Sequence, residues 1–116
     1  MSDVTIFHNP NCGTSRNTLA LLREKGLDPK VVEYVKVGWT APQLSALFQQ
    51  MGKSARDVLR VRGTEADALG LTAPGATDAQ IIAAMAKDPI LVERPIVVTP
   101  KGAALCRPAE TVLTLL

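Results

Sequence analysis

The sequence has few aromatic residues, no long apolar run and little net charge, and each shortage excludes a class of partner. Its four aromatic side chains are scattered, whereas a surface that stacks single-stranded bases needs several together. No apolar run approaches the roughly 20 residues of a membrane-spanning helix. The net charge of +2 is too small for a general nucleic-acid or membrane-surface binder. We therefore expect neither a nucleic-acid partner nor a membrane partner.

Two cysteines and one histidine also limit metal and disulfide chemistry. Neither cysteine belongs to a Cys-x-x-Cys pair, because position 15 is serine, and the set is too small for a structural zinc site, so no metal is expected. The N-terminus shows no basic segment followed by an apolar one, which argues against a signal peptide and for a cytoplasmic protein. A structural disulfide between Cys12 and Cys106 is not expected there. Two interpretations of a free cysteine remain. It has a chemical role, or it packs as a small buried hydrophobic residue.

The composition suits a single globular domain of residues 1–116, because 47% of the residues are hydrophobic and 21% are charged.

The pattern of the first third of the chain predicts a βαβ unit. Residues 4–7 and 31–35 predict strands. The helix between them carries Leu19 and Leu22, with Thr14 or Ser15 as its cap and Gly26 at its end. Two strands joined by such a helix should be parallel.

The remaining chain predicts a helical insertion followed by a hairpin and a last helix. Apolar residues at helical spacing lie between Thr40 and Gly52. Further helix starts are predicted at Ser54-x-x-Asp57, at Thr64 and at the capping box Thr77-x-x-Gln80. Residues 95–99 and 103–106 predict two strands around the turn Thr99-Pro100-Lys101-Gly102. Pro108 begins a helix with Val112, Leu113 and Leu116 on one face. The order β-α-β, helical insertion at about residues 40–88, then β-β-α predicts an α/β fold.

Cys12 occupies the position at which chemistry is expected. It lies between the first predicted strand and helix, where free backbone N–H groups and the helix dipole favour a thiolate. Gly13 lets a bound anion approach, and the Thr14 and Ser15 hydroxyls can donate to it. His8, across the tight loop, could lower the cysteine pKa through a positive charge. The alternative interpretations are a cysteine that only packs and a histidine that only caps the loop.

Arginine side chains near this position could bind an oxyanion, because their fixed fork of donors matches tetrahedral anions. Arg94 and Arg107 lie at the ends of predicted strands, and Arg60 follows a short helix of the insertion. Two or three of them converging on a thiolate would form an anion pocket. The alternative, a solvated or salt-bridged side chain, fits four other arginines better: Arg16, Arg23, Arg56 and Arg62.

Three segments carry a recognisable pattern. They are residues 8–17 (His-Asn-Pro-Asn-Cys-Gly-Thr-Ser-Arg-Asn), residues 93–100 (Glu-Arg-Pro-Ile-Val-Val-Thr-Pro) and Cys106-Arg107-Pro108. In this order and spacing they resemble the glutaredoxin-coupled arsenate reductase (ArsC) family, and the similarity extends over nearly the whole chain. The resemblance implies a thioredoxin-like fold with a helical insertion, which agrees with the predicted element order. It also implies a cis peptide bond at Arg94-Pro95.

The resemblance further implies a reaction. The catalytic residues would be Cys12, His8 and Ser15, and the oxyanion-binding residues would be Arg60, Arg94 and Arg107. The Cys12 thiolate would form an adduct with arsenate, with His8 tuning the cysteine and Ser15 donating a supporting hydrogen bond. Glutathione, as co-substrate, would attack the arsenic, and glutaredoxin would resolve the mixed disulfide and release arsenite. No bound cofactor and no role for Cys106 are implied, and we expect a monomer.

Two other functions remain open on the sequence. One is a glutathione-dependent thiol reductase of another substrate, and the other is a non-catalytic partner of the transcription machinery on the same fold. Relatives of the latter kind often carry Cys-x-x-Cys, and Ser15 in place of a second cysteine argues against their redox-switch form. The Cys12 loop and the three arginines favour an enzyme, because a pure binding module does not need an anion pocket.

Overall fold

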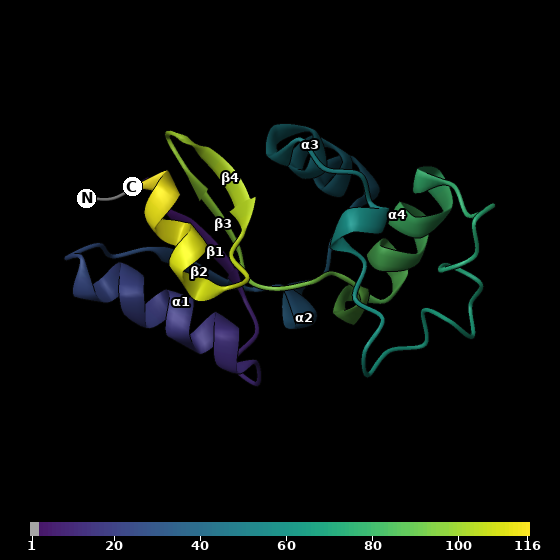
Figure 1. Ribbon diagram of the computed structural model, residues 1–116, viewed down its shortest axis with the longest axis horizontal. Helices are drawn as coiled ribbons and strands as arrows, with labels where there is room; N and C mark the ends of the chain where they lie inside the picture. Colours follow the sequence, from purple (N-terminus) through teal and green to yellow (C-terminus); the bar gives the residue numbers. More distant parts are fainter. Residues whose placement is uncertain (1–2) are drawn as a thin grey trace. The chain divides into compact units, whose positions relative to one another are not determined.

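The computed structural model describes residues 3–116, and the chain divides into two units (Figure 1). We call residues 3–37 and 94–116 the sheet unit and residues 38–93 the helical unit. The sheet unit contains β1 (Thr5–His8), α1 (Gly13–Glu24), β2 (Lys30–Glu33), α2 (Tyr34–Val37), β3 (Ile96–Thr99), β4 (Gly102–Leu105) and the 3₁₀ helix η3 (Ala109–Leu115). The helical unit contains α3 (Ala41–Met51), α4 (Asp78–Lys87) and the 3₁₀ helices η1 (Arg56–Val58) and η2 (Pro89–Leu91).

The sheet has four strands in the order β2-β1-β3-β4. The predicted parallel pairing of the first two strands is confirmed, with Ile6 opposite Val31. The predicted hairpin is confirmed as well, because β3 and β4 pair in antiparallel fashion with Thr99 opposite Gly102. β1 and β3 are antiparallel. This β-α-β and β-β-α arrangement with a helical insertion is the thioredoxin-like fold.

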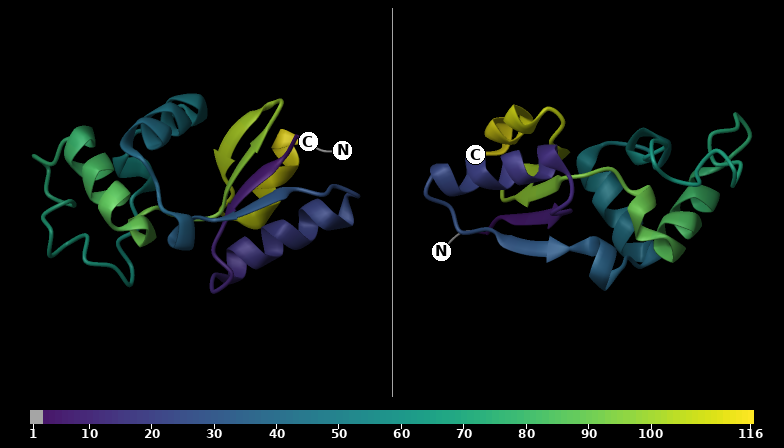
Figure 2. Two further views of the ribbon diagram at one scale, coloured as in Figure 1. Left: turned by 180° about the vertical axis from the view of Figure 1, so that it is seen from behind. Right: turned by 90° about the horizontal axis from the view of Figure 1, so that it is seen from below.

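The core of the sheet unit lies on the face of the sheet that α1 and η3 cover (Figure 2). Ile6 and Val97 from neighbouring strands are fully buried there, together with Leu22 of α1 and Val112 of η3. Complete burial of such a side chain stabilises the fold by roughly 1.5–3 kcal/mol. The shared core therefore fixes the starts of α1 and η3 relative to the sheet.

The start of α1 differs from its prediction. The N-cap residue is Cys12 itself, which makes no side-chain capping bond, and Thr14 and Ser15 lie inside the helix. The Ser15 side chain is fully buried and bonded elsewhere, so it does not cap. The predicted end of the helix is confirmed, because Gly26 follows α1 with a positive φ of 79°.

The second strand is shorter than predicted, because its partner ends. β2 stops at Glu33, which is opposite His8, the last residue of β1. β2 is the outermost strand, so residues beyond Glu33 have no neighbouring strand to pair with. Tyr34, which is 1% exposed, begins the short helix α2 instead.

The last helix has a different period from the one predicted. Its residues form a 3₁₀ helix, in which side chains repeat every three residues. The buried residues are accordingly Ala109, Val112 and Leu115, whereas Leu113 is 43% exposed. Val112 and Leu116 both pack against the core, as predicted, but the placement of Leu113 on the same face was wrong because it assumed an α-helical period.

The helical unit confirms two of its predicted starts. Thr40 and Thr77 each form a complete capping box, with Gln43 and Gln80 respectively, at the starts of α3 and α4. α3 and α4 contact each other. No helix in the described part of the chain is long and apolar enough to cross a membrane.

Of two further predicted helix starts in this unit, one is confirmed and one is wrong. The short helix predicted at Ser54-x-x-Asp57 is the single turn η1, and Ser54 and Asp57 bond to each other's backbone N–H groups at its start. The helix predicted from Thr64 is absent, since residues 61–76 form turns. The Thr64 hydroxyl bonds to the carbonyls of Arg60 and Val61 and thus stabilises a turn rather than a helix.

Candidate active site

Cys12 lies where β1 has ended and α1 begins. As the N-cap of α1 it has extended backbone angles, and its N–H donates to the carbonyl of Asn9 at 3.0 Å. Its own carbonyl accepts from the N–H of Arg16 at 3.0 Å. The side chain is partly exposed and carries a free thiol. This placement puts the sulfur beside the unpaired N–H groups of the first helical turn.

The surroundings of Cys12 lower the pKa of its thiol. Burial acts in the opposite direction and is the largest single influence, but the backbone N–H of Ser15 and the side chains of Arg107 and Arg94 together outweigh it. Each of these groups donates a hydrogen bond to the sulfur or places a positive charge near it, and both effects favour the thiolate. This direction agrees with the shift that the position of Cys12 at a helix start predicts.

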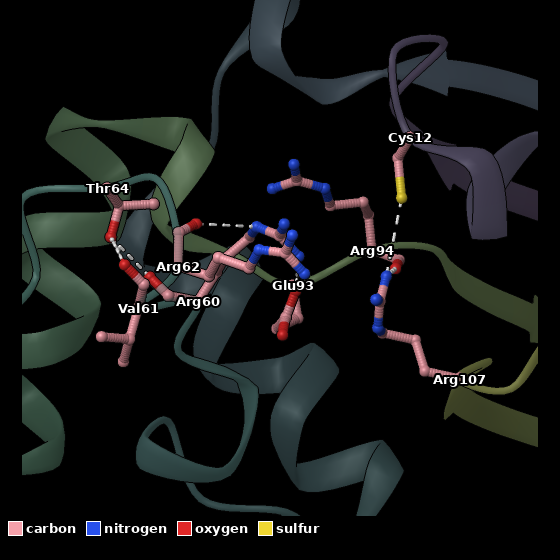
Figure 3. Close-up of polar contacts among 8 residues, drawn as sticks. All are labelled: Cys12, Arg60, Val61, Arg62, Thr64, Glu93, Arg94 and Arg107. Atoms are coloured by element: carbon pink, nitrogen blue, oxygen red, sulfur yellow. Dashed lines mark hydrogen bonds and ion pairs between the residues drawn. The ribbon is translucent and has the colours of Figure 1, made fainter.

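Arg107 links the cysteine to the segment before β3. Its Nη1 donates to Cys12 Sγ at 3.5 Å and to the carbonyl oxygen of Arg94 at 2.9 Å (Figure 3). Arg107 and Cys12 are 95 positions apart in the sequence, and the sheet unit brings them together. Arg107 is exposed, so most of its donors are accessible to an incoming anion.

Arg94 is buried without enough partners. It is 8% exposed, and its Nε and Nη1 have no hydrogen-bond partner among residues 3–116. Leaving a buried donor unsatisfied costs roughly 1–3 kcal/mol, and more for a charged group. Native proteins rarely accept this cost without a functional reason. An oxyanion next to Cys12 would satisfy these donors.

The peptide bond between Arg94 and Pro95 is cis, as the family resemblance implied. A second cis bond, which the sequence analysis did not anticipate, joins Arg107 and Pro108. Each of the two arginines described above thus directly precedes a cis proline.

His8 contacts Ser15. Its Nδ1 lies 2.6 Å from Ser15 Oγ, which also accepts from the backbone N–H of Asn9 at 3.1 Å. Burial, opposed by the charge of Glu33, lowers the pKa of His8. His8 is not among the groups whose charges or hydrogen bonds lower the pKa of Cys12. The histidine instead fixes Ser15, whose N–H donates to the sulfur.

Asn9 is a structural part of the loop that the sequence analysis missed. It is 6% exposed, and its Oδ1 accepts from the N–H of Asn11 at 3.0 Å. The signal was present in the sequence, because asparagine side chains commonly bond to the backbone two residues later in turns. Arg16 supports the same loop by donating to the carbonyl of Pro10 at 2.8 Å.

Arg60 belongs to the helical unit. Its Nη1 donates to Glu93 Oε1 at 2.8 Å, and its Nε donates to the carbonyl of Arg62 at 3.1 Å (Figure 3). Arg56 is a structural residue, as its Nη2 donates to the carbonyls of Ala73 and Ala76. Of the predicted site residues, the sheet unit thus brings together Cys12, His8, Ser15, Arg94 and Arg107.

Cys106 is part of the core of the sheet unit. It is fully buried, and burial raises the pKa of its thiol to about 12. Like Cys12, it is a free cysteine. Among residues 3–116 no group of three or more histidine, cysteine, aspartate or glutamate side chains is arranged to hold a metal ion.

Comparison with known proteins gives consistent matches over nearly the whole chain. Residues 7–115 match the model of the ArsC family. An arsenate reductase of Synechocystis sp. is 54% identical over 113 residues, which are 97% of this chain and 81% of that protein. An arsenate reductase of Escherichia coli is 47% identical over 116 residues, covering 100% of this chain and 82% of its own length. The solved structure of an arsenate reductase from Vibrio cholerae superposes with a TM-score of 0.92, at 40% identity and with 97% of each chain covered.

Proposed function

The chain belongs to the ArsC family, and on this premise we propose that it is an arsenate reductase that uses Cys12 as its nucleophile. The observation that carries the proposal is the buried Arg94 guanidinium, which has two unpartnered donor atoms and lies among the groups that lower the pKa of Cys12. A thiolate beside free arginine donors can bind an oxyanion and attack its central atom.

The chemistry begins with the Cys12 thiolate. Its sulfur attacks the arsenic of arsenate, and one arsenate oxygen leaves as water, which gives a thiolate–arsenate adduct. Arg94 and Arg107 bind the remaining oxygens, because guanidinium groups offer paired donors that match them. Arg60 is the third oxyanion-binding residue in this proposal. His8 and Ser15 keep the N–H of Ser15 directed at the sulfur.

The electrons come from outside the protein. Reduction of arsenate to arsenite takes two electrons, which two thiols supply by forming one disulfide. Cys106 is fully buried and has a strongly raised pKa, so it is a poor internal partner. We propose that glutathione attacks the adduct and that glutaredoxin resolves the resulting mixed disulfide. The sum is arsenate and two thiols giving arsenite, one disulfide and water.

In this proposal both units form a single ArsC-type domain of residues 1–116. The protein acts as a monomer in the cytoplasm, without a bound cofactor, where glutathione and glutaredoxin are available.

The test is a coupled assay with purified protein. Arsenate-dependent oxidation of NADPH is measured with glutathione, glutaredoxin and glutathione reductase present, and then with each omitted in turn. We expect turnover in the complete mixture, and none without glutathione or glutaredoxin or with Cys12→Ser. Turnover that survives in Cys12→Ser would refute the nucleophile. No turnover of arsenate by the wild type would refute the substrate.

A further inference from the structure

Asn9 is a buried polar residue in the loop that carries Cys12. It is 6% exposed, whereas asparagine is mostly exposed in folded proteins. Its side-chain oxygen Oδ1 accepts from the N–H of Asn11 at 3.0 Å. A polar side chain is thus buried beside the nucleophile although it takes no part in the chemistry proposed above.

The hydrogen bonds of Asn9 reach three other residues of the same loop. Besides the bond to Asn11, its carbonyl accepts from the N–H of Cys12 at 3.0 Å, and its own N–H donates to Ser15 Oγ at 3.1 Å. Cys12 carries the sulfur, and the backbone N–H of Ser15 donates to that sulfur. Asn9 therefore connects the residue that bears the thiolate with a residue that stabilises it.

Only the bond to Asn11 depends on the side chain at position 9. Any residue there could make the two backbone bonds, whereas a side-chain oxygen that accepts from the N–H two residues later requires asparagine, aspartate or, more weakly, serine or threonine. Residues 10 and 11 are exposed. The only other side chain of the described residues that bonds to this stretch is Arg16, whose Nη1 donates to the carbonyl of Pro10. The Asn9 side chain thus limits how far the loop can move.

The position of the loop matters because Cys12 also contacts a group outside it. Arg107 Nη1 lies 3.5 Å from Cys12 Sγ and 2.9 Å from the carbonyl oxygen of Arg94 (Figure 3). The segment before β3 therefore anchors Arg107 independently of the loop. Since a hydrogen bond weakens steeply when its distance or angle departs from the optimum, a loop that moved away from Arg107 would stabilise the thiolate less.

We propose that Asn9 is a positioning residue for the nucleophile, because its side chain closes the loop of residues 9–12 and fixes the place of Cys12 Sγ. The sulfur then stays in contact with the N–H of Ser15 and with Arg107. This inference rests on the proposed role of Cys12 as the nucleophile. Asn9 acts through Cys12 and is not itself among the groups that donate to the sulfur. A residue that only stabilised the fold would leave the acidity of Cys12 and the binding of an oxyanion unchanged.

The first measurement is the pH midpoint for alkylation of Cys12 by iodoacetamide, which needs no turnover. Cys106 is fully buried, so alkylation of the folded protein reports on Cys12. Asn9→Ala should raise the midpoint by about half a pH unit, because a looser loop weakens the hydrogen bonds to a charged sulfur without removing them. The charged groups beside the sulfur, Arg94 and Arg107, are the same in both proteins, so the change reports on the position of the sulfur.

The second measurement is the arsenate concentration that half-protects Cys12 from the same reagent. Asn9→Ala should raise it about fivefold, within the range of coupling between contacting residues. Asn9→Ser keeps an oxygen that can accept from the same N–H more weakly, so it should lie between Asn9→Ala and the wild type in both measurements. The matched control is Asn17→Ala, at an exposed asparagine of α1, which should behave as the wild type.

Two results would overturn the proposal. A lower melting temperature of Asn9→Ala with an unchanged midpoint and unchanged protection would mean that Asn9 only stabilises the fold. Equal behaviour of Asn9→Ser and Asn9→Ala would mean that the side-chain oxygen is not the cause. If Asn9→Ala does not fold, Asn9→Gln replaces it, since its longer side chain places the oxygen too far along to close the loop; a midpoint equal to the wild type would then overturn the proposal.

Failure of the proposed function gives a different result. If arsenate does not protect the wild type although Asn9→Ala raises the alkylation midpoint, arsenate is not the substrate and the positioning role of Asn9 stands.

Discussion

Replacement of Arg94 by methionine should stabilise the protein while abolishing its binding of oxyanions. Arg94 is 8% exposed and leaves Nε and Nη1 without partners among residues 3–116. Each unsatisfied donor costs roughly 1–3 kcal/mol, so two of them cost about 2–6 kcal/mol. Methionine has an unbranched, flexible chain that can fill the same space without buried donors. The loss of the contact with Cys12 offsets part of the gain, and we expect the free energy of unfolding to rise by about 2 kcal/mol.

Thermal melts with and without arsenate would measure this. A gain of about 2 kcal/mol corresponds to a rise of about 8 °C in melting temperature for a chain of this size. Arsenate at about 100 times its Kd should stabilise the wild type by about 2.7 kcal/mol and should leave Arg94→Met unchanged. Arg23→Met, at an exposed arginine, should stay within about 0.5 kcal/mol of the wild type. A melting temperature of Arg94→Met at or below that of the wild type would refute the reasoning.

Three further predictions concern titration and thiol chemistry. The pH midpoint of Cys12 alkylation should lie below the ordinary cysteine pKa of about 8.5. Arg107→Ala should raise that midpoint because it removes a donor to the sulfur. An unchanged midpoint would mean that Arg107 does not contact the thiolate in solution. Cys106, whose pKa is raised to about 12 by burial, should resist alkylation in the folded protein, and Cys106→Ser should remain active. If Cys106→Ser is inactive and thioredoxin alone supports turnover of the wild type, the protein uses a Cys12–Cys106 disulfide cycle. Burial lowers the pKa of His8 in the folded state below its unfolded value of 6.5, so the unfolded chain takes up the proton first as the pH falls. The contribution of His8 to stability is therefore fully present above pH 6.5 and is lost as the pH falls toward the folded-state pKa. Denaturant unfolding of wild type and His8→Asn across this range should show a pH dependence that the variant lacks, and parallel curves would contradict it.

Elements with a complete local signal were predictable from the sequence. The capping boxes of Thr40 and Thr77 specify helix starts through bonds within four residues. The hairpin between β3 and β4 is specified by its turn residues. In each case the residues that determine the structure are neighbours in the chain, so their pattern is sufficient.

Elements that depend on distant partners were not predictable to the same degree. β2 ends at Glu33 because β1 ends opposite to it. The residues after Glu33 contain no sequence signal for the end of the strand. The period of η3 follows from its packing on the sheet, with Val112 and Leu115 buried. The residues around Thr64 predict a helix start from their sequence. In the structure the Thr64 hydroxyl instead donates to two preceding carbonyls and stabilises a turn.

The candidate site divides in the same way. Cys12 could be predicted as a reactive thiolate from its place at a helix start, which is a local property. Its contact with Arg107, 95 positions away, and the pairing of Arg60 with Glu93, 33 positions away, are products of the folded chain. The contact of His8 with Ser15 is of the same kind, because the sequence around a residue does not specify whether its side chain is buried.

The donors of Arg94 hydrogen-bond to oxygen atoms and do not discriminate between oxyanions with different central atoms. Phosphate has the same tetrahedral arrangement of oxygens as arsenate, so we expect it to occupy these donors and to compete with arsenate. Selectivity then lies in the reaction step, since a thiol can reduce the arsenic of the adduct but cannot reduce phosphorus. In a cell rich in phosphate the enzyme would spend much of its time reversibly occupied by an anion that it cannot turn over. Activity measured in a phosphate buffer should accordingly fall below activity in a buffer without tetrahedral anions.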